Sequence, residues 1–320
     1  MKHLYSYSSY QPLSGLPGEG TAAERAAGLG CDGLELLTPY GNVPGHFIGA
    51  SVAAHLPFAA DWYSGWAGRA DLRGMDEGWA RYVYFGRDRG EMVRNVALSI
   101  ERAAEIDPAY CVVHAGSANL GEVTLRRQTD DSRGVLSALA EMMNEVAASF
   151  KGGEPPARLA FENLWWPGLR LRENWERRLL EDRLEFENWG LCLDTGHLMN
   201  TLPGADDEES AIDGALEVID GYDSGTRERI CAMHFHLSAS AEYRRSFKEE
   251  PRPEGETVPE TMSRVYPHIT RIDQHRPFSS PRCVELAEAI SPEFLTHEMM
   301  GSESGDPIAD LRKQIAHFGR

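Results

Sequence analysis

Histidine, aspartate and glutamate residues recur at the ends of apolar runs in this chain. Six consecutive strand-like runs end in such side chains, namely His55, His114, Glu162, Asp194 with His197, His234 with His236, and Glu298. One polar residue at a strand end is usually a satisfied structural group, but burying six such sets is costly unless they pair or bind a metal. Imidazole and carboxylate ligands together suit Zn, Mn, Fe or Co. The pattern predicts a divalent-metal site.

The runs that carry these residues are short and read as buried strands. They cover His3–Ser8, Gly33–Leu37, Ala50–Pro57, Tyr110–Ala115, Arg158–Leu164, Gly190–Asp194, Ile230–Leu237 and Glu293–Met299. Segments of helical periodicity alternate with them, such as Glu91–Ile106, Arg133–Phe150 and Arg172–Asn188. Eight strands alternating with helices predict an α/β fold, a (β/α)8 TIM barrel, as one domain over residues 1–320.

Local signals refine this expectation. Thr21 and Glu24 have the spacing of a capping box, and Asp306 before Pro307 reads as the start of the last helix. Thr38–Gly49 is barely long enough for a helical crossover, so the second helix is expected to be degenerate. A doubly wound open sheet is the alternative fold, but no GxGxxG segment opens a helix.

Two connections are too long to be plain turns, and both follow strands. Ala59–Gly90 follows the third strand and is rich in aromatic residues and arginine, and Ser238–Ile272 follows the seventh. In a barrel both would lie at the carboxyl ends of the strands, where active sites form. They are therefore expected to be long loops over the site, or else ordinary insertions packed at the barrel mouth.

The charge balance bears on partners. With 32 Lys and Arg against 50 Asp and Glu, the net charge is −18, which disfavours nucleic acid and anionic membranes. The arginines of Ala59–Gly90 are matched by acidic residues, so no basic patch forms there. Five scattered cysteines, no apparent leader and no membrane-length apolar run predict a cytoplasmic protein.

Two motifs carry a family resemblance. Phe161-Glu162-Asn163-Leu164 and Asp194-Thr195-Gly196-His197, together with the segment Gly30–Leu36, resemble the xylose isomerase-like TIM barrel superfamily. That superfamily includes sugar and sugar-phosphate isomerases, ketose 3-epimerases and the endonuclease IV type of DNA repair enzyme. The resemblance spans most of the chain and indicates the superfamily more specifically than the substrate.

For the sugar enzymes, the resemblance implies one divalent ion (Mn, Zn, Co or Mg) held by Glu162, Asp194, His236 and Glu298. Glu162 and Glu298 would also move a proton beside a metal-polarised carbonyl, and His197 would orient the substrate. A metal-dependent sugar or sugar-phosphate isomerase or epimerase, acting on a small carbohydrate, is therefore the leading expectation. A homo-oligomer is compatible with the sequence.

The endonuclease IV branch implies a different centre, a phosphoester hydrolase with three zinc ions. It would enlarge the ligand set with His55, His114, His197, Asp273 and His275. A third interpretation is a barrel that binds a metal or ligand without catalysis. Metal content separates these three.

Several residues are expected to face the substrate rather than the metal. In the sugar enzymes, His55 and His114 would contact substrate, and Trp165 and Trp166 would form an apolar wall or merely pack a loop. His234 shares a strand face with His236, two residues deeper, and is expected to support the site or fill the core.

Overall fold

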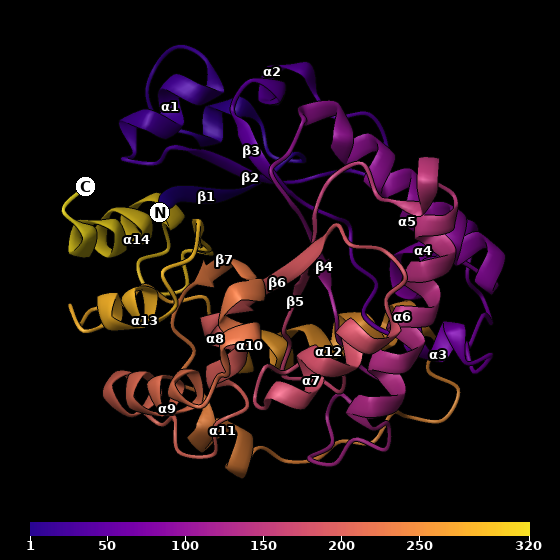
Figure 1. The fold of residues 1–320 in the computed structure, drawn as a ribbon. Helices are drawn as coiled ribbons and strands as arrows, with labels where there is room; N and C mark the ends of the chain where they lie inside the picture. The colour runs from indigo at the N-terminus through magenta and orange to yellow at the C-terminus, as the bar shows by residue number, and fades with distance from the viewer.

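Eight parallel strands pair in chain order and close on themselves, β1 pairing with β8, in a computed structural model that describes residues 1–320 (Figure 1). The strands are β1 Lys2–Ser8, β2 Gly33–Leu37, β3 Ser51–His55, β4 Cys111–His114, β5 Leu159–Glu162, β6 Trp189–Asp194, β7 Ile230–Phe235 and β8 Phe294–His297. The (β/α)8 barrel expected from the sequence is confirmed, and each predicted strand lies where the sequence placed it, most of them a little shorter.

Helices surround this barrel (Figure 1). They are α1 Ala22–Gly28, α2 Gly45–Ile48, α3 Trp62–Trp66, α4 Glu77–Tyr84, α5 Arg89–Ala103, α6 Ser132–Ala148, α7 Asn174–Arg183, α8 Thr195–Met199, α9 Glu208–Asp220, α10 Ser224–Arg229, α11 Ala241–Ser246, α12 Val258–Ile272, α13 Cys283–Ile290 and α14 Pro307–Ile315. The capping box at Thr21 and the Asp306 cap are both present. The second helix is a single turn, as expected.

Helix α7 is shorter than the predicted Arg172–Asn188. It ends where Leu184 takes an extended backbone, with φ −72° and ψ 133°. The residues after it connect directly to β6. Apolar residues there that continue the helical pattern therefore lie in the connection and not in the helix. Periodicity alone does not reveal this early stop.

The inside of the barrel is layered. Small and aromatic side chains form an apolar cluster at its base, made of Leu4, Ala53, Tyr110, Val112, Ala160, Cys192, Cys231, Ala232 and Phe294. Side chains two residues apart on a strand point to the same side. The last residue of several strands lies two positions after a member of this cluster and therefore also points into the barrel. Thus β4, β5 and β6 end in the buried or half-buried side chains His114, Glu162 and Asp194.

The two long connections fold into helices rather than open loops. The connection after β3 contains α3, α4 and α5, and that after β7 contains α11 and α12. A third long connection, residues 115–131 after β4, was not singled out in the sequence. It packs against α12, because Ala118, Leu120 and Val123 share one apolar cluster with Val258 and Val265.

Two expectations about cysteines and membranes can be compared with the structure. All five cysteines are free and buried. Among the helices, none combines the length and the apolar character needed to cross a bilayer.

The two chain termini lie close together beside β1 and α14 (Figure 1). Near them, His3 of β1 and His297 of β8 form a buried pair. His3 Nδ1 lies 3.0 Å from His297 Nε2, and the Gln314 amide donates to His297 Nδ1 over 2.8 Å. His297 therefore carries its proton on Nε2 and donates it to His3. Burial lowers the pKa of His3 to about 4 and that of His297 to about 3.

This pair predicts acid sensitivity. Because the folded pKa values lie below that of an unfolded histidine, the stabilisation is complete above about pH 6.5 and is lost as the pH falls towards 3. The free energy of unfolding should fall by up to about 1.4 kcal/mol per pH unit for each histidine. Denaturant titrations across this range measure it. His297→Gln should flatten the profile and exposed His46→Gln should not; equal slopes in all three proteins would contradict the prediction.

Candidate metal centre

Strand register brings the ionisable strand ends together. His114 is paired with Glu162 across β4 and β5, and Asp194 with His234 across β6 and β7. All parallel strands finish at one end of the barrel, so these side chains converge on its axis. His55, from the end of β3, completes the inward ring on that side.

A first group of three is centred on Glu162. Its Oε2 lies 3.4 Å from His55 Nε2 and 3.1 Å from His114 Nε2, yet makes no well-directed hydrogen bond. His55 Nδ1 lies 2.9 Å from the carbonyl of Leu56, which accepts its proton and leaves the Nε2 lone pair facing Glu162. An imidazole oriented in this way is typical of metal ligands.

A second group lies around His234 and Asp194. His234 Nδ1 is 3.2 Å from Glu162 Oε1, 3.5 Å from Glu298 Oε1 and 3.7 Å from Asp194 Oδ2. His236 Nε2 is 3.0 Å from Asp194 Oδ2, while its Nδ1 has no partner. His234 in β7 and His236 directly after β7 therefore both face Asp194. The sequence analysis had predicted only His236 as a metal ligand.

A third group comes from outside the strands. Asp273, directly after α12, places Oδ2 3.3 Å from His197 Nε2 and 3.3 Å from His275 Nδ1. His275 Nε2 lies 3.3 Å from Glu298 Oε2, and its ring stacks on that of His236 with centroids 4.0 Å apart. The structure thus brings together every residue of the larger ligand set.

The turn after β6 is built by local hydrogen bonds. The Asn163 side chain accepts from the Asp194 amide at 2.7 Å and donates to its carbonyl at 3.0 Å, which ties the ends of β5 and β6 together. Asp194 caps α8 by accepting from the His197 amide. His197 Nδ1 lies 2.9 Å from the Asn163 carbonyl, so Nε2 faces Asp273.

Burial and mutual charge set the proton affinities. Burial raises the pKa of Glu162, but the charges of His114 and His234 outweigh it and hold that pKa well below its usual range. Glu298 behaves alike, with a pKa of about 2. Burial lowers the pKa of His275, but Asp273 and Glu298 raise it overall to about 9. Without a metal, the cluster holds itself together as ion pairs.

The donor set fits a divalent transition metal. Imidazoles and carboxylates alone form it, and Glu162 Oε2, His236 Nδ1 and His275 Nδ1 are buried atoms without hydrogen-bond partners. Buried polar atoms without partners are costly in a protein interior, and atoms of these types are satisfied when they bind an ion. The clusters of His, Asp and Glu at this end of the barrel could therefore hold metal.

Aromatic rings border the ligands. The Trp165 ring lies 5.0 Å from that of His197, and Trp166 lies 4.9 Å from Trp165. Phe58, which the sequence analysis missed, stacks on His114 at 4.3 Å and is 39% exposed. Its only sequence signal is an apolar residue three positions after His55. Glu35 was also missed, although it is a lone carboxylate inside the apolar run Gly33–Leu37.

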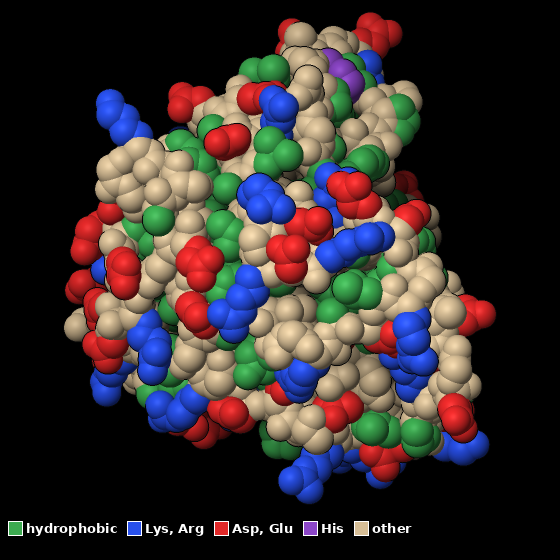
Figure 2. Space-filling model, turned by 90° about the vertical axis from the view of Figure 1, so that its right-hand side faces the viewer, with side chains coloured by type: hydrophobic (Ala, Val, Ile, Leu, Met, Phe, Trp, Pro, Cys, Tyr) green, Lys and Arg blue, Asp and Glu red, His purple; other side chains and the backbone are tan.

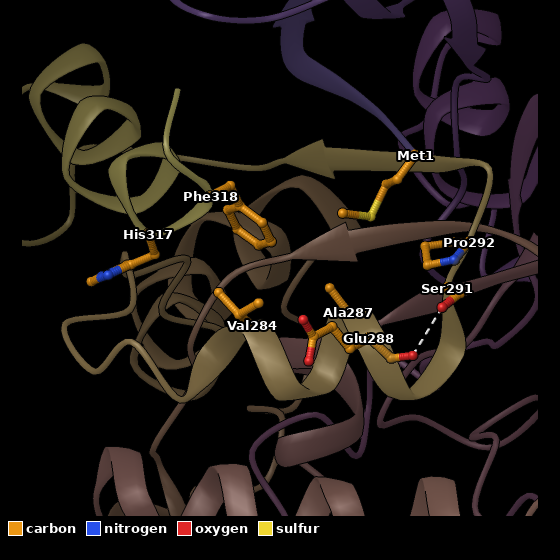
Figure 3. Close-up of a pocket in the computed structure, with 8 residues that line it drawn as sticks. All are labelled: Met1, Val284, Ala287, Glu288, Ser291, Pro292, His317 and Phe318. Atoms are coloured by element: carbon orange, nitrogen blue, oxygen red, sulfur yellow. Dashed lines mark hydrogen bonds between the residues drawn. The ribbon is translucent and has the colours of Figure 1, made fainter.

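A separate hollow of about 450 Å³ opens at the opposite end of the barrel (Figure 3). Figure 3 shows it between α13, the N-terminal Met1 and the last turn around His317 and Phe318. Its lining has one carboxylate, Glu288, and one imidazole, His317, so it lacks the converging ionisable groups of the strand ends.

Solved structures of several other proteins have a similar fold. No curated protein sequence matches this chain. Solved structures similar to it are a D-tagatose 3-epimerase-like protein (14% identity, TM-score 0.52, covering 100% of this chain and 97% of the other) and 3-keto-D-glucoside 4-epimerase from E. coli (12%, 0.52, 99% and 98%). Endonuclease IV from Thermus thermophilus is similar to the same degree (17%, 0.51, 100% and 99%).

At these identities the structural likeness shows the fold alone. Membership is shown by sequence, because the family model described as "Xylose isomerase-like TIM barrel" matches residues 23–291. The chain belongs to the xylose isomerase-like TIM barrel family.

Proposed function

We propose that this protein is a metal-dependent hydrolase that cleaves a phosphoester bond in a small molecule, with two or three divalent ions at the barrel mouth. The observation that carries the proposal is the position of Asp273, 3.3 Å from His197 of α8, and of His275, 3.3 Å from Glu298, which directly follows β8. A single-ion isomerase needs neither residue. Their convergence with His197 and Glu298 favours the larger centre, which the family resemblance associates with phosphoester hydrolysis.

The larger centre has a direct chemical use. Bound divalent ions would neutralise a phosphoryl group and lower the pKa of a water molecule. In hydrolysis, the water oxygen bonds to phosphorus, one P–O ester bond breaks, and the departing oxygen takes up a proton. His55, His114, His197, His236 and His275 would hold the ions with the four carboxylates Glu162, Asp194, Asp273 and Glu298. The Trp165 ring, 5.0 Å from that of His197, would border them.

Charge at the mouth supports a small substrate rather than a nucleic acid. Arg69 pairs with Asp130, while Arg73 and Arg252 both pair with Asp71. On the face that carries α3 to α6, basic and acidic side chains are interspersed (Figure 2). A protein that follows a phosphodiester backbone needs a free basic track.

A second candidate, a sugar or sugar-phosphate isomerase or epimerase, is favoured by the placement of Glu162 and Glu298. Both carboxylates approach His234 Nδ1, at 3.2 Å and 3.5 Å, so two proton carriers border one small volume. Proton removal and return at a sugar carbon uses such a pair. This candidate needs only one ion, so the count of bound ions separates the two functions.

Metal content is the first test. Zinc-loaded, gel-filtered protein should retain about three ions per chain, and an Asp273→Asn/His275→Gln variant about two, because the third group loses two ligands. Inductively coupled plasma mass spectrometry measures the ratio, and hydrolysis of p-nitrophenyl phosphate esters should fall roughly 10- to 100-fold. Exposed Asp220→Asn/His46→Gln is the matched control. One ion per chain, unchanged in the variant, would overturn the hydrolase and leave the isomerase.

The pH dependence of the metal-free protein is the second test. Since the pKa of folded His275 is raised to about 9, its stabilisation is complete below about pH 6.5 and is lost as the pH rises to 9. With chelator present, the free energy of unfolding should fall over this range, and by less in His275→Gln. Zinc should reverse the fall, because the ion replaces the protons. A profile with chelator that is flat from pH 6.5 to 9 would contradict this prediction.

A further inference from the structure

The two oxygens of the Asp273 carboxylate have different partners. Oδ2 is directed into the candidate metal centre, 3.3 Å from His197 Nε2 and 3.3 Å from His275 Nδ1. Oδ1 accepts from two neutral donors, the Asn200 amide nitrogen at 3.5 Å and the Ser238 hydroxyl at 3.4 Å. Both hydrogen bonds are long, and Oδ1 has no other donor, so its position depends on the two together.

A chain of hydrogen bonds sets the orientation of the Asn200 amide. Arg244 Nε donates to the Ser240 hydroxyl at 3.2 Å, and this hydroxyl donates to Asn200 Oδ1 at 2.8 Å. A guanidinium has donors only, so the Ser240 proton is directed to Asn200. The NH₂ group of Asn200 is therefore turned towards Asp273. The reversed amide would place its oxygen against a carboxylate.

This chain runs through the protein interior and joins segments that are distant in sequence. Asn200 is 3% exposed and directly follows α8, the helix that carries His197. Ser240, 2% exposed, directly precedes α11, and Asp273 directly follows α12. Buried polar chains of this kind fix geometry when every member has a partner. The Asn200 amide therefore links two segments that both supply candidate ligands.

The backbone of the turn after α12 is held separately. The Gln274 amide donates to the Ser238 hydroxyl at 2.9 Å, and Leu237 and Arg276 exchange backbone hydrogen bonds of 2.8 and 3.0 Å. These contacts fix where the turn lies against the residues that follow β7. They leave the Asp273 carboxylate free to rotate about its Cβ–Cγ bond, so this rotation is restrained by the donors at Oδ1.

We propose that Asn200 is a positioning residue for the metal centre, holding Oδ1 of Asp273 so that Oδ2 is the oxygen that binds an ion. The inference rests on the several-ion centre of the proposed function. A carboxylate that is already oriented loses less conformational freedom when the ion binds. Ser240 and Arg244 act one step further away, because they orient the Asn200 amide.

The proposal predicts a selective loss of metal affinity. Asn200→Leu removes the amide with little change in volume and should raise the Kd of one Zn²⁺ ion roughly 10- to 100-fold, the usual effect of losing the partner behind a metal ligand. The other ions should keep their Kd values. Competition with chelators of graded affinity measures each Kd. In an Asp273→Asn background, which weakens the same ion, Asn200→Leu should add no further loss.

Asn174→Leu is the matched control. The Asn174 amide also links two segments, donating to the Gly221 carbonyl at 2.9 Å and accepting from the Asp223 amide at 3.0 Å, but it contacts no candidate ligand. This variant should leave every Kd unchanged. Ser240→Ala keeps Asn200 but removes the hydroxyl that orients its amide. It should raise the same Kd by a smaller factor, and it carries the test if Asn200→Leu does not fold.

The outcomes separate this inference from the proposed function. An equal loss of every ion would indicate a general defect in folding, and a loss that persists without Asp273 would place the effect elsewhere. Either result would overturn the positioning role, as would several ions bound with unchanged affinity in Asn200→Leu. Wild-type protein that binds a single ion, with a Kd unaffected by Asp273→Asn, would overturn the several-ion centre and this inference together.

Discussion

Burial of charge at one end of the barrel is the constraint on which the rest of this structure depends. Glu162, Asp194 and His234 are nearly or fully buried at the ends of adjacent strands, where uncompensated charges are costly. Carboxylates and imidazoles alternate in space there, so that almost every carboxylate faces an imidazole. This alternation lowers the cost of burying the charges in the metal-free cluster. It also brings nitrogen and oxygen atoms close enough together to share an ion.

Layering inside the barrel explains how this cluster keeps its shape. The apolar base supplies rigid packing, and the layer around Glu35, Tyr110 and Thr296 provides hydrogen bonds directly above it. Above that layer, Asn163 links the ends of β5 and β6 through both atoms of its amide. The ligands on the strands are therefore restrained by neighbouring strands, which favours a preformed site.

The strands and most ligand positions could be predicted because ionisable residues stand out at the ends of apolar runs. Other features could not, because they depend on contacts distant in sequence. His234 and His236 share a strand face, and only the stagger of β7 against β6 shows that both reach Asp194. The approach of Asp273 to His197 depends on how α12 packs on the connection after β4. The sequence shows Glu35 as a lone carboxylate in β2, but it does not show which residues contact that carboxylate.

Helix α12 has a consequence for how such centres arise. Asp273 and His275 follow this helix directly, whereas the other ligands lie on strands, one residue after them, or on α8 after β6. No strand pairing involves the α12 segment, so its length can vary between relatives without opening the barrel. A lineage could thus gain or shed one metal by altering a single insertion. Divergence between one-ion and several-ion chemistries on this scaffold would then require few changes to the barrel itself.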